Sequence, residues 1–286
     1  MSADQDGAPL DEPYRGPRDG LPRGLPFPPD HVPLLRGWHL RKSWRYVTFW
    51  SAETVLCAAE AKVGPLRQEY WGVWDRPNRR LWKRTHAFRH RVHGPPERLL
   101  VDDGDVVIEL PFEPAETFEL YRPEGSAYIW SRKEFTPRAR GSLMLGDERR
   151  ELNGVAFVDI SAGYHPRRTS WRWFAGAGPD AGGGTVAWNL ITGLFDTPTS
   201  SERTVWAGGP GTEVGPLTFS DDLARVSVPG GGELTFTEEA RLSIRRNFVL
   251  LRTTYEHAFG TYSGSLPGGL EVREAWGVRE RFDALW

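Results

Sequence analysis

The chain has 286 residues and a net charge of −2, with 39% hydrophobic and 26% charged residues. This length accommodates one large or two ordinary domains, and the near-zero net charge gives no general attraction to nucleic acid or anionic membranes. Because Cys57 is the single cysteine, an internal disulfide framework is excluded, which fits a reducing compartment. No secretory segment follows Met1 and no apolar run is long enough to span a membrane, so we expect a cytoplasmic protein.

The first 30 residues lack hydrophobic periodicity and are rich in proline, glycine and charge, which predicts a flexible N-terminal arm over residues 1–30. From about Val32, β-branched and aromatic residues alternate with polar ones in short segments such as 42–50, 70–74 and 105–110. This alternation is typical of half-buried strands. No apolar stripe of helical period extends beyond about two turns, so the sequence predicts an all-β protein.

Turn residues divide the rest of the chain, which contains 32 glycines and 23 prolines. Segments rich in these residues have the spacing of hairpin loops and occur at 176–184, 208–215, 229–232 and 263–269. We find no internal sequence repeat. The length favours two β halves, residues 31–145 and 146–286, of which the second carries the main motif.

Three histidines lie close together in a basic segment. His86 and His90 have the spacing that would bring two zinc ligands together on a helix, and His93 follows. The lysine and arginines between residues 83 and 91 oppose the binding of a cation, so a basic exposed strand and loop is the favoured interpretation. The same mixture of basic and aromatic residues only weakly resembles a nucleic-acid surface. We therefore expect no metal, no cofactor and no nucleic-acid partner.

The most informative segment runs from Phe157 to Trp173. An apolar strand ends at Asp159, and a turn, a basic loop and a second strand with two indoles follow. Both faces of the first strand are mostly apolar, so we expect it to be covered on both sides, while Trp171 and Trp173 share one face of the second strand. A carboxylate beside an aromatic wall is typical of a functional site. A turn-capping aspartate and core tryptophans would explain the same pattern.

Three further polar residues are candidates for this site. Asn189 interrupts an apolar strand, and a ligand in a cavity would satisfy its hydrogen bonds if the amide were buried. Glu202 is a candidate acid–base partner of Asp159. Lys133 would lower the pKa of Asp159 if it approached the carboxylate, as would Arg168, although surface charge is the simpler explanation of Lys133.

From about Trp38 onward, the chain resembles a bacterial family known as domain of unknown function 2804. The residues that carry the resemblance are Lys42–Tyr46, Lys133, Gly141, Asp159, Gly163, Tyr164, Thr169, Trp171, Trp173, Asn189, Glu202, residues 277–281 and residues 285–286. The family has an aromatic residue where Ile160 stands and another near His165, so the chain departs from the pattern at these two places.

This family is more distantly similar to the lipocalin-like double β-barrels that include carotenoid 1,2-hydratase and tocopherol cyclase. Those proteins are rich in tryptophan, and their cavities take hydrophobic molecules. The resemblance implies two lipocalin-like halves, each an antiparallel β-barrel or curved sheet. Because fold analogy does not establish function, no residue role is carried over.

These patterns lead to the hypothesis that the protein binds a hydrophobic, isoprenoid- or polyketide-like molecule in an aromatic-lined cavity. Cofactor-free hydration, cyclisation or isomerisation would use Asp159 or Glu202 as the acid. The indoles of Trp44, Trp171 and Trp173 would face the developing cation.

In the same hypothesis Tyr164 and Asn189 orient the polar ends of the ligand, and Tyr46, Lys133 and Arg168 complete the binding site. One alternative is a non-catalytic carrier, in which Asp159 and Arg168 pair to hold the loop. A second alternative is a carbohydrate-active protein, because tryptophans beside paired carboxylates also suit sugars. The oligomeric state stays open.

Overall fold

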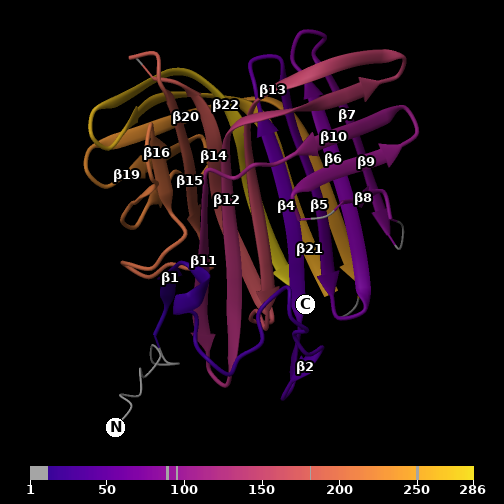
Figure 1. Cartoon of the computed structure of the whole chain (residues 1–286), viewed down its shortest axis with the longest axis vertical. Coiled ribbons are helices and arrows are strands. Elements are labelled where there is room, and N and C mark those ends of the chain that lie inside the picture. Colours follow the sequence, from indigo (N-terminus) through magenta and orange to yellow (C-terminus); the bar gives the residue numbers. More distant parts are fainter. Residues whose placement is uncertain (1–11, 88–89, 95, 181, 249–250) are drawn as a thin grey trace.

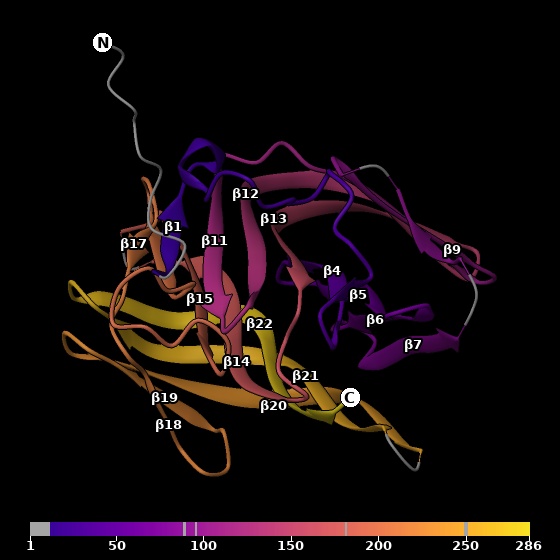
Figure 2. The same ribbon diagram turned by 90° about the horizontal axis from the view of Figure 1, so that it is seen from below.

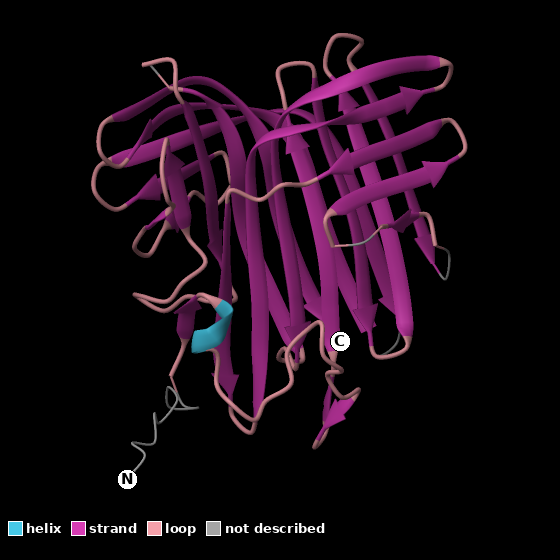
Figure 3. Ribbon diagram, in the orientation of Figure 1, coloured by secondary structure: helices cyan, strands magenta, loops and turns pink. Residues whose placement is uncertain are grey.

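The structure is a computed structural model that describes residues 12–87, 90–94, 96–180, 182–248 and 251–286. These residues form two curled antiparallel β-sheets, and no α-helix occurs among them (Figures 1 and 3). The prediction of an all-β protein with two curved halves is confirmed. In the same residues, no helix has the length and apolar character needed to cross a membrane.

The first sheet follows the order β7-β6-β5-β4-β13-β12-β10-β9-β8, while β11 pairs with both β12 and β1. Its strands are β1 (Tyr14–Gly16), β4 (Lys42–Trp50), β5 (Thr54–Val63), β6 (Leu66–Asp75), β7 (Arg80–Ala87), β8 (Val92–His93), β9 (Arg98–Asp103), β10 (Val106–Pro111), β11 (Glu116–Glu124), β12 (Ala127–Leu145) and β13 (Glu148–Gly163). A short hairpin, β2 (Leu35–Arg36) with β3 (His39–Leu40), precedes β4, and one 3-10 turn, η1 (Arg18–Gly20), follows β1.

The second sheet follows the order β17-β16-β15-β14-β22-β21-β20-β19-β18. Its strands are β14 (Arg168–Pro179), β15 (Thr185–Thr192), β16 (Thr204–Ala207), β17 (Thr212–Glu213), β18 (Thr218–Phe219), β19 (Arg225–Val228), β20 (Gly232–Phe248), β21 (Leu251–Leu266) and β22 (Leu270–Leu285). Figure 2 shows both curved sheets from below, where β22 of the second sheet lies against β4 and β5 of the first.

The two sheets repeat one topology. Apart from β1, each has a run of four consecutive antiparallel strands, β4–β7 and β14–β17, and in each the last strand of the sheet returns to pair with the first strand of this run. On the edge of β12 away from β13, β10 and β11 pair with different stretches, whereas on the edge of β21 away from β22 a single strand, β20, pairs along the length of β21. The order of the strands is therefore repeated, although the amino-acid sequence shows no repeat.

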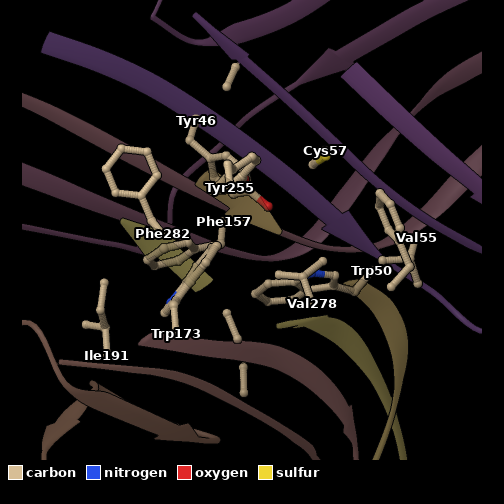
Figure 4. Close-up of a cluster of buried hydrophobic side chains, with 14 of the residues drawn as sticks. Tyr46, Trp50, Val55, Cys57, Phe157, Trp173, Ile191, Tyr255, Val278 and Phe282 are labelled. Carbon is tan, nitrogen blue, oxygen red and sulfur yellow. The ribbon is translucent and has the colours of Figure 1, made fainter. Parts of the chain in front are cut away.

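Each sheet has its own apolar core, and the two sheets share a third core between them. Along β4, Phe49 points into the core of the first sheet, whereas Tyr46 and Trp50 point into the shared core. Figure 4 shows part of this shared core, in which Phe157 lies 6.3 Å from Trp50 and 6.4 Å from Trp173 between ring centroids. Alternate residues thus bury both faces of a strand.

The sheets divide later in the chain than the sequence predicted. The first sheet continues through β13 to Gly163, and the second begins with β14 at Arg168, so residues 146–163 do not belong to the second half. The glycines at 176–178 lie within β14 rather than in a loop. A side chain at Gly176 would meet the rings of Trp188 and Tyr262 at 3.0 and 3.2 Å, so this glycine lets the rings approach the strand.

The predicted N-terminal arm is packed over its described part. Residues 1–11 lie outside the described residues, but β1 pairs with β11, and Leu21 and Phe27 are buried beside Tyr128. Residues 12–30 therefore do not form a flexible arm, because two large apolar side chains hold them against the first sheet.

Candidate functional site

A row of three side chains crosses the first sheet at the level of Asp159. Lys133 on β12 lies opposite Asp159 on β13, and Asp159 lies opposite Tyr46 on β4. Residues that pair across antiparallel strands project to the same face. This face packs toward the second sheet, because Tyr46 and Phe157, two residues before Asp159, belong to the shared core.

A buried lysine joins this row to the second half. Lys133 Nζ lies 2.6 Å from Asp159 Oδ1 and 2.5 Å from Glu202 Oε2, and Glu202 lies just before β16. The side chains of Lys133 and Glu202 are 2% and 1% exposed, whereas that of Asp159 is 16% exposed. The two acids that the sequence suggested as partners are therefore joined through a lysine between them, and only Asp159 reaches solvent.

The charges of this triad depend on one another. Burial would lower the pKa of Lys133, but the neighbouring carboxylates Asp159 and Glu202 outweigh burial and raise it. Burial raises the pKa of Glu202, and the ammonium of Lys133 opposes that rise. Apart from this ion pair, the oxygens of Glu202 have no hydrogen-bond partner among the described residues. Lys133 thus provides the compensating charge for Glu202.

Weaker donors complete the surroundings of the Asp159 carboxylate. Trp44 Nε1 lies 3.4 Å from Oδ2, and the hydroxyl of Ser131 lies 3.3 Å from Oδ1. The Ser131 hydroxyl also lies 2.9 Å from the carbonyl oxygen of Ile160, which is the better acceptor by distance. The ring of the half-buried Trp44 lies 5.6 Å from that of Trp171 across the interface. Of the predicted indoles, Trp44 contacts Asp159 directly, whereas Trp171 is next to Trp44 and donates to another carboxylate.

A second carboxylate, Glu280 on β22, is bound in the same manner. Trp171 Nε1 donates to Oε2 at 3.0 Å, while Tyr255 Oη and His257 Nδ1 lie 2.5 and 2.8 Å from Oε1. The hydroxyl of Tyr70, on the first sheet, lies 2.6 Å from Tyr255 Oη. Because the Tyr255 proton goes to Glu280, Tyr70 donates to Tyr255, and this hydrogen bond links the halves.

The two carboxylates occupy equivalent places in the repeated topology. Each lies on the last strand of its sheet, opposite a basic residue of the preceding strand and an aromatic residue of the first strand. The corresponding pairs are Asp159 and Glu280, Lys133 and His257, Tyr46 and Trp173, Trp44 and Trp171, and Ser131 and Tyr255. Each half thus presents to its carboxylate one indole N–H, one hydroxyl and one basic side chain.

Two of the predicted site residues lie elsewhere. Tyr164 is fully buried beneath the N-terminal segment, where its hydroxyl donates to the carbonyl oxygen of Pro33 at 2.9 Å. Strand alternation does not reach Tyr164, because β13 ends at Gly163, where φ is 151°. Arg168 is exposed at the start of β14, and the basic partner of Asp159 is Lys133 instead.

The side chains of Asn189 and Trp173 form a hydrogen bond with each other. Trp173 Nε1 donates to Asn189 Oδ1 at 2.6 Å, and Asn189 Nδ2 donates to the backbone carbonyl of Glu202 at 2.6 Å. Both residues are buried. The amide therefore supports the loop that carries Glu202, and protein groups make the hydrogen bonds that the sequence suggested for a ligand.

Sequence patterns did not predict the site around the second carboxylate, which consists of Glu280, Tyr255, His257 and Tyr70. One signal for Glu280 was present, since Val278 and Phe282 flank it on the same face of a strand. A carboxylate on an otherwise apolar face requires donors. The identity of those donors depends on the pairing of β21 with β22, which no local pattern specifies.

The histidine cluster has other partners. His86 Nε2 lies 2.6 Å from Asp103 Oδ2. Glu60, Glu69 and His90 bring their ligand atoms within 4.8 Å of one another, but the guanidinium of Arg67 contacts all three. A protein cation therefore already occupies this acidic cluster.

Two grooves on the described surface are lined by other residues than Asp159. One, of about 320 Å³, is lined by Ala52, Trp74, Arg76, Pro77, Arg79 and Glu239. The other, of about 410 Å³, lies between residues 28–32 of the N-terminal segment and the strands β4, β5 and β13. Asp159 is 16% exposed and lines neither groove, whereas Trp44, which contacts its carboxylate, lines the second.

Comparison with solved structures finds distant similarities. A chain described as AttH-like, from Nitrosomonas europaea, has a TM-score of 0.48 and 12% identity, covering 88% of this chain and 99% of the other. CghA has a TM-score of 0.42 and 9% identity, covering 85% of this chain and 87% of the other. Its structure with Sch210972 has a TM-score of 0.40 and 9% identity, covering 86% and 88%. Comparison with curated proteins gave no match.

A family profile gives a direct assignment. The family described as domain of unknown function DUF2804 matches residues 103–286, which is well over half of the chain. The match includes Asp159, Lys133, Glu202 and Glu280, whereas the segment Lys42–Tyr46 precedes it. The chain belongs to the DUF2804 family.

Proposed function

We propose that the protein binds an apolar, ring-containing small molecule where Asp159 reaches solvent between the sheets. There it promotes a cofactor-free isomerisation: the Asp159 carboxylate removes a proton from one carbon of the substrate, and the carboxylic acid so formed returns the proton to another carbon. One observation carries the proposal: the Asp159 carboxylate is held by Lys133 at 2.6 Å, yet it stays partly exposed beside the half-buried indole of Trp44, whose ring lies 5.6 Å from that of Trp171.

The ion pair defines the role of Asp159 in this proposal. The side chains that contact the Asp159 carboxylate, Lys133, Trp44 and Ser131, are all hydrogen-bond donors, so in this proposal the carboxylate accepts a proton rather than donating one. This role differs from the acid that the sequence favoured.

The same ion pair favours a second candidate, a non-catalytic carrier of an apolar molecule. Lys133 already compensates Asp159, and a carboxylate in a stable pair can hold an interface without transferring protons. The carbohydrate alternative has less support. Glu202 is 1% exposed, so it cannot flank a sugar ring together with Asp159 as a pair of catalytic carboxylates must.

The test uses defined probes with the full chain. Quenching of tryptophan fluorescence is titrated with β-ionone, a cyclic isoprenoid, with farnesol, an open-chain isoprenoid, and with cellobiose. We expect saturable quenching by β-ionone that weakens in Trp44→Phe and in Trp171→Phe. Each probe is then incubated with the protein, and mass spectrometry together with chromatography detects an isomerised product.

Asp159→Asn separates catalysis from binding, with Asp147→Asn as the matched control in the exposed β12–β13 turn. An enzyme loses product formation in Asp159→Asn, while the affinity for the probe stays within a few-fold. Binding without product in the wild type supports the carrier. Saturable quenching by cellobiose alone would contradict both candidates.

A further inference from the structure

Exposed apolar side chains concentrate at the β2–β3 hairpin. Leu34, Leu35 and Trp38 are 41%, 57% and 100% exposed, and they are three of the six exposed large hydrophobic residues in the described chain. Trp38 lies at the tip, next to Gly37, whose φ of 57° makes the tight turn. Isolated exposed apolar residues are ordinary, but a cluster at a projecting tip marks an interaction site.

The hairpin is held firmly although its apolar side chains face outward. The Arg41 amide donates to the Leu34 carbonyl, and the Gly64 amide donates to the Arg41 carbonyl, both at 2.9 Å. Arg36 Nε also donates to the carbonyl of Ser126 at 2.8 Å. These contacts attach the hairpin to two strand ends, and Figures 1 and 3 show it below the ends of the long strands.

The charge around the tip is positive. Residues 31–42 contain two arginines, one lysine and two histidines but no acid, in a chain with a net charge of −2. Arg41, Arg45 and Lys62 line the adjacent groove of about 410 Å³, against Asp30 and Glu60. Local charge rather than net charge decides what an exposed tip attracts at short range.

We propose that this hairpin docks the protein on an anionic lipid surface, with Trp38, Leu34 and Leu35 inserted at the interface and Arg36 and Arg41 at the level of the lipid phosphates. Tryptophan favours the boundary between hydrocarbon and headgroups, and basic residues beside it add attraction to anionic lipid. A protein partner fits less well, because a stable interface buries about 800 Å² on each side and needs a complementary surface. A narrow tip can insert into a bilayer without a complementary protein surface.

The test is flotation of the full chain with vesicles. One set contains phosphatidylcholine with phosphatidylglycerol, and the other contains phosphatidylcholine alone. We expect the wild type to float with the anionic vesicles, to bind the neutral ones weakly, and to dissociate as salt is added. Trp38→Ala should lower the partition coefficient roughly tenfold, because the inserted indole is lost.

Val107→Ser is the matched control, because Val107 is 40% exposed and pairs with Met144 near the end of β12 remote from the hairpin. It should bind as the wild type does, and all variants should keep the wild-type melting temperature. The proposal is overturned if the wild type stays unbound, if Trp38→Ala binds equally well, or if neutral vesicles bind as tightly as anionic ones. A concentration-dependent dimer that Trp38→Ala abolishes would assign the tip to a second copy of the chain instead.

Discussion

Lys133 and Lys42 illustrate two ways in which this protein buries a lysine. Lys133 lies between two carboxylates, whereas Lys42 Nζ donates to the carbonyl oxygens of His165 and Pro166 at 2.5 and 3.5 Å. Replacing a buried ion pair with well-packed apolar residues is often neutral or stabilising. Stability is therefore a weak reason for the Lys133 triad, and an electrostatic role at Asp159 is a better one.

The effect of burying Lys42 can be tested through the pH dependence of the unfolding free energy. Burial lowers its pKa from 10.5 to about 8, so between these values the unfolded chain binds more protons than the folded protein. The unfolding free energy contributed by this group therefore rises with pH across that window and is lowest below about 8. We expect Lys42→Met to remove this rise.

Urea unfolding of the wild type and Lys42→Met at several pH values checks the difference, with Lys62→Met as the control. Lys62 pairs with Glu60 at 2.7 Å and is 41% exposed, so its replacement should leave the pH dependence of the unfolding free energy unchanged. Parallel pH dependences in the wild type and Lys42→Met would disprove the expectation.

Single strands show how far the sequence predicts this site. The segment 42–50 coincides with β4, and the expectation that the Phe157–Asp159 strand is covered on both faces is confirmed. Alternation works within such strands because successive side chains must take opposite faces. Alternation does not reach Tyr164, which follows the end of β13. The separate prediction of a loop from glycine content was wrong at Gly176, which lies in β14 and leaves room for neighbouring rings.

The partners across the interface were not predictable from local patterns. Lys133 and Glu202 are 69 positions apart in the chain, and Tyr70 meets Tyr255 across 185 positions. The sequence of a strand indicates which of its residues share a face. Which residues of the other sheet that face contacts depends on the order of all the strands. The sequence therefore indicated Asp159, Lys133 and Glu202, but it indicated neither their pairing nor Glu280 and its partners.

The contact between β6 and β21 provides a test at the level of elements. A side chain at Gly72 would place its Cβ 2.8 Å from Cζ of Phe259, a buried ring of the opposite sheet. Gly72→Ala should lower the unfolding free energy by about 1–3 kcal/mol, because overpacking forces the sheets apart.

Denaturant unfolding measures this change against Gly209→Ala. Gly209 is exposed, and a methyl group added there would meet no atom within 4 Å, so the effect of this control should be small. Equal unfolding free energies of the two variants would show that the interface accommodates a methyl group at Gly72 without loss of stability.

At the scale of the molecule, several contacts make the halves one unit. They share an apolar core, Tyr70 donates to Tyr255, and Lys133 pairs with Glu202. Arg15 on β1 also donates from the first sheet to the carbonyl of Ser201 at 2.6 Å. Separation of the halves would expose the shared core together with these polar groups.

We therefore expect one cooperative thermal transition for the whole chain, with calorimetric and van't Hoff enthalpies in agreement. Differential scanning calorimetry measures both enthalpies. Two resolved transitions would mean that the sheets unfold independently, contrary to this expectation.

The equivalence of Asp159 and Glu280 has a consequence for how the site could evolve. In a symmetric homodimer, any substitution appears in both subunits, so two matching sites must change in step. Here both sheets lie on one polypeptide, so a substitution can change one site without changing the other. The two sites differ in this way: a lysine pairs with the acid of the first sheet, and a histidine pairs with the acid of the second.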